Sequence, residues 1–67
     1  MNKQIIRQEA ISTAYTMLSQ EEDYQDIENA ILNEDRFQPL LEGKDGDELF
    51  KYVNGIIRMA ERQAGIR

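Results

Sequence analysis

The sequence predicts an all-α fold: a small three-helix bundle with an additional short helical turn before the last helix. Apolar residues recur at helical spacing along two long segments, and capping signals stand between the segments. No stretch shows the sustained alternation of a strand. At 67 residues the chain forms a single helical domain, 1–67. We expect helices over about 2–18, 20–33 and 46–64, and the short turn at about 36–42.

The first helix, about 2–18, is expected because its apolar residues gather on one half of a helical wheel. These residues are Ile6, Ala10, Ile11, Ala14, Tyr15, Met17 and Leu18. Polar side chains such as Glu9 and Thr16 take the other half, together with Ile5, which the pattern does not explain. One face of this helix is therefore expected to be buried.

The second helix is expected to begin at Gln20, because Ser19 and Glu22 have the spacing of a capping box. In that motif the serine side chain accepts from the third helical N–H and the glutamate reaches back to the serine N–H. The helix should end near Asn33. Its narrow apolar stripe consists of Tyr24, Ile27 and Ile31.

The same segment, Ser19-Gln20-Glu21-Glu22-Asp23, resembles the Ser-Gln-Glu-Leu-Asp signature of small helical sporulation phosphatases. It departs from that signature at Glu22, where the family has Leu. Because a capping box accounts for the same residues, the chain is not assigned to that family.

The short helical turn, about 36–42, is indicated by apolar residues around Pro39, which is tolerated in the first turn of a helix. Gly43 is expected to close it with a left-handed conformation. Asp45 and Glu48 then offer a second capping signal for the last helix. The clearest amphipathic pattern of the chain follows, in Leu49, Val53, Ile56, Ile57, Ala60 and Ala64.

The chain has few residues that carry chemistry. It has no Cys and no His, so a disulfide is excluded and we expect no metal site and no cofactor. The turn at Gly43 and Gly46 fails the calcium-loop pattern in both registers. Without His, Ser12 and Ser19 lack the usual base for nucleophilic catalysis. We therefore expect a protein that is not an enzyme.

Charge is segregated along the sequence. Of 13 carboxylates only Glu9 and Glu61 lie outside 21–48, where Arg36 and Lys44 are the only cations. The net charge is −5, which disfavours non-specific binding to nucleic acid or anionic membranes. An acidic face that contacts a basic protein surface, in the manner of a phosphate mimic, is one interpretation; solubility is the other. The face consists of Glu21, Glu22, Asp23, Asp26 and Glu28.

Two further surfaces are expected on the last helix. Tyr52, Met59 and Ile66 are spaced by seven and form a candidate seam for a second copy or a partner helix, unless they cover the rim of the core. Lys51, Arg58 and Arg62 lie on one face of the wheel, opposite the core, and form a basic stripe. These three residues are the candidate phosphate contacts of the alternative function, nucleic-acid binding.

The sequence thus favours a small acidic protein that binds and modulates another protein. Inhibitors, antitoxins, phage-type antagonists and accessory subunits are the classes that fit. A marginal core of this size favours reinforcement by a homodimer or a partner. We expect a cytoplasmic location, because the lack of Cys fits a reducing compartment and no apolar run has the length of a membrane span.

Overall fold

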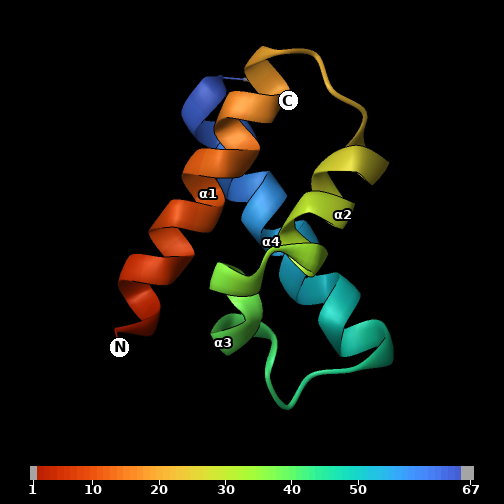
Figure 1. The fold of residues 1–67 in the computed structure, drawn as a ribbon. Coiled ribbons are helices and arrows are strands. Elements are labelled where there is room, and N and C mark those ends of the chain that lie inside the picture. Colours follow the sequence, from red (N-terminus) through yellow and green to blue (C-terminus); the bar gives the residue numbers. More distant parts are fainter. Residues whose placement is uncertain (1, 66–67) are drawn as a thin grey trace.

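The computed structural model describes residues 2–65, and within this range the chain forms helices and no strand (Figure 1). The elements are α1 (Lys3–Ser19), α2 (Tyr24–Asn33), the 3₁₀ turn η1 (Asp35–Phe37), α3 (Gln38–Leu41) and α4 (Gly46–Ala64). The predicted all-α helical bundle is confirmed. The predicted short turn corresponds to η1 and α3 together.

The three long helices run alternately up, down and up (Figure 1). α2 returns antiparallel to α1, and α4 then runs in the same general direction as α1 and crosses it. The most extensive contact between elements joins α1 and α4, the first and the last helix of the chain. η1 and α3 also pack against α1 and α2 and close the bundle near the N-terminus of α1.

The core is entirely apolar among the residues that the structure describes. Its buried members are Ile6, Ala10, Ile11, Ala14, Ile27, Ile31, Phe37, Leu40, Leu41, Val53, Ile56, Ile57 and Ala60. Phe37 is the largest fully buried side chain, and it comes from the 3₁₀ turn rather than from a long helix. Every long helix contributes apolar residues to this core, as their periodicity predicted.

The predicted start of the second helix is wrong. Ser19 is the last residue of α1, and its hydroxyl donates to the Tyr15 carbonyl oxygen at 3.0 Å instead of capping a new helix. The chain then stops with a Schellman motif: Glu22 N–H bonds to Met17 O and Glu21 N–H bonds to Leu18 O, both at 3.0 Å. α2 begins only at Tyr24, with Asp23 at its N-cap position.

Glu21 takes the left-handed position of this Schellman motif, with a φ of 61°. Glycine usually holds that position, because a Cβ atom crowds the following carbonyl oxygen there. The sequence therefore carried a misleading signal: the residues that resemble a helix start form a helix stop.

Two predicted apolar positions point outward instead. Tyr15 on α1 is 40% exposed, and Tyr24 at the start of α2 is 54% exposed. The predicted second helix began at Gln20, about one turn before α2 begins. The helical wheel therefore grouped Tyr24 with Ile27 and Ile31, although Tyr24 is the first residue of α2. Ile5, which the wheel placed on the polar side of α1, is indeed 61% exposed.

The turn before α4 follows the glycine signals. Gly43 and Gly46 have φ angles of 79° and 54°, a region that residues with a Cβ rarely adopt. Asp45 occupies the N-cap position of α4 as predicted, but its side chain makes no capping hydrogen bond. Gly65 ends the helix in the left-handed conformation, with a φ of 77°.

Candidate interaction surfaces

The predicted acidic face lies at the end of the bundle where α1 passes into α2. Glu21, Glu22 and Asp23 form the connection itself, and Asp26 lies in the first turn of α2. All four side chains are exposed, whereas Glu28 is half-buried. The prediction that these carboxylates lie along the second helix is thus wrong for the first three. We call Glu21, Glu22, Asp23 and Asp26 the α1–α2 acidic cluster.

A second group of carboxylates lies at the opposite end of the bundle, in the connection between α3 and α4 and the first turn of α4 (Figure 1). This α3–α4 acidic cluster consists of Glu42, Asp45, Asp47 and Glu48, all exposed. Folding therefore divides the acidic segment of the sequence between two ends of the molecule. The two clusters offer two separate contact surfaces rather than one continuous line.

Few of the charges are neutralised within the protein. Arg36 pairs with Glu34, with 3.2 Å between Nε and Oε1, and this is the only salt bridge among residues 2–65. The basic stripe of α4 forms no ion pair with the acidic segment in this range. The carboxylates of both clusters face solvent without a cation within ion-pair distance in this range.

The candidate seam is placed only in part. Tyr52 and Met59 are half-buried and pack against the core, as the rim interpretation describes. Ile66 lies outside the described residues. Whether the exposed parts of Tyr52 and Met59 also contact a second copy or a partner helix stays a prediction.

The basic stripe is fully presented to solvent. Lys51, Arg58 and Arg62 are exposed on α4, and their spacing of seven and four places them on one face of that helix. Gly55 lies on the same face, and a Cβ built there meets nothing within 4 Å. Among residues 2–65, no side chain therefore packs against α4 at Gly55.

The chain matches no family model, no curated protein and no solved structure. The surfaces must therefore be interpreted from their own geometry and charge.

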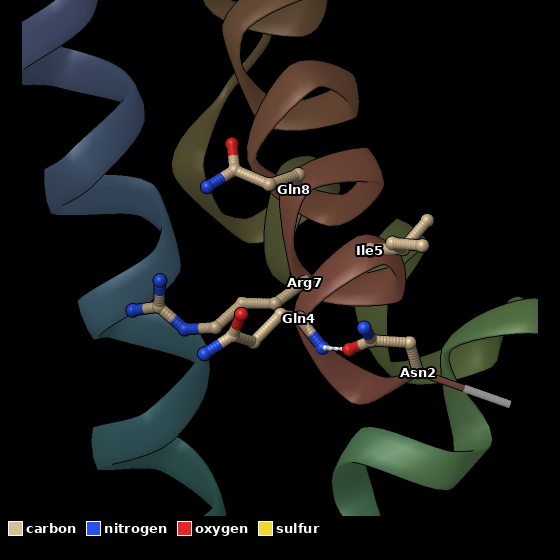
Figure 2. Close-up of a pocket in the computed structure, with 5 residues that line it drawn as sticks. All are labelled: Asn2, Gln4, Ile5, Arg7 and Gln8. Carbon is tan, nitrogen blue, oxygen red and sulfur yellow. Dashed lines mark hydrogen bonds between the residues drawn. The ribbon is translucent and has the colours of Figure 1, made fainter.

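A third surface surrounds the first turns of α1, and the sequence did not predict it. A shallow depression of about 560 Å³ is lined by Asn2, Gln4, Ile5, Arg7 and Gln8. In Figure 2, Arg7 and Gln4 extend from α1 toward α4, while Ile5 leaves α1 on the other side. The Gln4 N–H donates to the side-chain Oδ1 of Asn2 at 2.8 Å, which caps the helix. The one available signal was Ile5, an apolar residue on the polar side of the wheel.

The depression continues along α1 as a second hollow of about 360 Å³. Its lining residues are Ile5, Gln8, Glu9, Ser12, Thr13, Thr16 and Arg36. Ile5 and Gln8 belong to both hollows, so the exposed isoleucine stands at their junction.

The described residues hold neither a membrane span nor a metal site. No helix in 2–65 combines the length and apolar character that a membrane span needs. Within the same range, no three acidic side chains converge closely enough to hold a metal ion.

Proposed function

We propose that this protein acts by binding another protein that presents a basic surface, and that it modulates that partner as an inhibitor, antagonist or accessory subunit. The observation that carries the proposal is the α1–α2 acidic cluster. Four exposed carboxylates stand together in a tight connection and its adjoining helix turn, with no cation paired to them in the described range. Charge complementarity therefore favours a basic partner.

The geometry favours a contact at this end for a second reason. The Schellman motif fixes the backbone of Glu21 and Glu22 through two hydrogen bonds of 3.0 Å. Side chains on an ordered connection lose less conformational entropy on binding than side chains on a loose loop. The cluster thus combines electrostatic attraction, which speeds association, with a backbone that is already in place.

The test compares the two acidic clusters as matched surfaces. Glu21, Asp23 and Asp26 are changed to Lys in one variant, and Glu42, Asp45 and Asp47 in another. A partner is first captured from cells of the source organism, then purified and titrated by calorimetry at several salt concentrations. We expect the first variant to lose affinity by on the order of tenfold or more.

The second variant is the control, since it carries the same net charge and should bind within about twofold of the parent at a given salt concentration. Equal losses in both variants mean that total charge alone matters, which contradicts a defined contact. An undiminished affinity in the first variant also contradicts the proposal.

Nucleic-acid binding is the second candidate, and one observation favours it. Lys51, Arg58 and Arg62 are exposed and make no ion pair within residues 2–65, so all three are free to contact phosphates. Fluorescence anisotropy with DNA and RNA oligonucleotides tests this function. Tight binding that weakens steeply with salt, and that is lost when the three cations become Gln, would replace the protein-binding proposal.

A further inference from the structure

A small pocket of about 130 Å³ lies where the first turns of α1 meet α3, the α3–α4 connection and α4. It is lined by Lys3, Gln4, Arg7, Leu40, Lys44 and Tyr52. Three of these side chains are cations and none is a carboxylate, although the chain has a net charge of −5. We call this positively charged hollow the basic pocket.

Two contacts hold Lys44 in the wall of the basic pocket. Its Nζ donates to the Leu40 carbonyl oxygen at 3.2 Å and lies 4.7 Å from the centre of the Tyr52 ring. An ammonium group has three donor hydrogens, so the bond to Leu40 leaves two for another acceptor. Because the Lys44 side chain is half-buried and already positioned, an arriving anion has little ordering cost to overcome.

Arg7 and Lys3 supply the remaining positive charge from α1. Arg7 is half-buried and extends from α1 toward α4, with Gln4 beside it (Figure 2). In residues 2–65 neither cation pairs with a carboxylate of the protein. The pocket also lies at the N-terminus of α1, where the helix dipole adds to the positive potential.

We propose that the basic pocket binds a phosphate group. A guanidinium fork and two ammonium groups are the donors that proteins use for phosphate oxygens. A phosphate ester carries about 1.5 to 2 negative charges near neutral pH, so three cations match it better than they match a carboxylate with one charge. The site does not depend on the proposed protein contact, which uses the other end of α1.

Inorganic phosphate and glycerol phosphate are the probes. ¹⁵N-labelled protein is titrated by NMR with each of them, and with sodium chloride and sodium acetate at equal ionic strength. We expect saturable shifts at Gln4, Lys44 and Tyr52 with a phosphate. The affinities of the two probes then show whether the pocket prefers free phosphate or a phosphate ester. Shifts that are no larger than those with chloride, or that acetate reproduces with equal affinity, would overturn the proposal.

Arg7→Gln and Arg36→Gln form a matched pair of variants. Each removes one guanidinium charge, but Arg36 lies exposed on η1 outside the pocket. We expect Arg7→Gln to weaken phosphate binding by about tenfold or more, because a charge-assisted hydrogen bond is lost, and Arg36→Gln to leave it nearly unchanged. Equal weakening in both variants would show general screening and would contradict a built site.

Lys3→Gln is a second test variant for the case that Arg7→Gln does not fold. Lys3 is exposed at the first position of α1, so the fold does not depend on its side chain. If Arg7→Gln gives a poorly dispersed spectrum, the parent titration together with Lys3→Gln decides the question. A saturable response in the parent that Lys3→Gln weakens severalfold supports the proposal, and an unaltered response contradicts it.

Discussion

Arg36 and Thr13 join two elements that are far apart in sequence: the Arg36 Nη2 on η1 donates to the Thr13 Oγ1 on α1 at 2.9 Å. The same guanidinium pairs with Glu34 and lies 4.6 Å from the centre of the Phe37 ring. The two residues are 23 positions apart in the sequence, and their hydrogen bond links η1 to α1. The last residue of η1 is Phe37, whose side chain lies in the core.

Thr13→Val removes the acceptor while keeping the shape of the side chain. We expect a loss of about 0.5–1 kcal/mol in the free energy of unfolding, since the hydrogen bond is exposed. Thr16→Val is the control, because Thr16 lies exposed on α1 and its side chain makes no hydrogen bond within the described residues. Urea unfolding monitored by circular dichroism measures both. Equal losses in the two variants would mean that the Arg36 contact contributes nothing.

The two phenylalanines of the chain offer a second matched pair. Phe37 is 0% exposed and Phe50 is 52% exposed. We expect Phe37→Ala to cost about 3–5 kcal/mol, which approaches the roughly 3–10 kcal/mol that stabilises a domain of this size, whereas Phe50→Ala costs about 0.5 kcal/mol. Thermal melting should show the midpoint of Phe37→Ala lowered by roughly 12–40 °C, at about 4–8 °C per kcal/mol for a domain of this size. A cooperative transition near that of the parent would contradict the central place of Phe37.

Glu21→Gly should stabilise the protein by about 0.5–1 kcal/mol, because glycine accepts the left-handed backbone that Glu21 adopts at a φ of 61°. Glycine relieves the steric cost in the folded state, but it also makes the unfolded chain more flexible, which destabilises the folded state. The expected gain is the difference between these two effects. Glu22→Gly removes the same charge from a residue without a positive φ. Urea unfolding should show no gain for this control, and a gain of equal size would point to charge as the cause.

Gly55→Ala should raise the free energy of unfolding by about 1 kcal/mol, the difference in helix propensity between the two residues. Gly55 lies in the middle of α4 with nothing within 4 Å of an added Cβ, so the methyl group meets no obstacle. Gly43→Ala is expected to destabilise, because Gly43 has a φ of 79°. If thermal melting shows a loss for Gly55→Ala, a contact that requires glycine must exist at that position.

The seam hypothesis makes a separate prediction about self-association. If Tyr52 and Met59 contact a second copy, sedimentation velocity at micromolar concentration should show a dimer that Met59→Lys converts to a monomer. Lys51→Glu, a charge change at an exposed position on another face of α4, should leave the dimer intact. A parent protein that stays monomeric over the whole concentration range would remove the hypothesis.

Periodicity predicted most of the fold because the core residues are apolar and regularly spaced. α4 spans the predicted residues, Gly46–Ala64, and α1 lies within one residue of the prediction at each end. The start of α2 failed for a physical reason: serine followed by glutamates suits a helix start, but the backbone hydrogen bonds of Glu21 and Glu22 end α1 instead. Local residue preferences do not reveal which pattern tertiary packing selects.

The candidate sites were less accessible to sequence reasoning. Exposure of the two acidic clusters and of the basic stripe followed from charge alone, whereas Glu28 is half-buried. The basic pocket did not, because Lys3, Lys44 and Tyr52 become neighbours only when α1 packs against α3 and α4. Division of the acidic segment between two ends likewise depends on the direction of α2.

The parallel course of α1 and α4 has a practical consequence for any capture experiment (Figure 1). The first turn of α1 lies beside the basic pocket, and the last turn of α4 lies at the end of the bundle that carries Glu21, Glu22 and Asp23. The choice of tagged terminus therefore decides which surface is shielded from ligands. Fusing the label at each terminus in turn, and comparing what each bait retains, would assign a captured molecule to one end of the bundle.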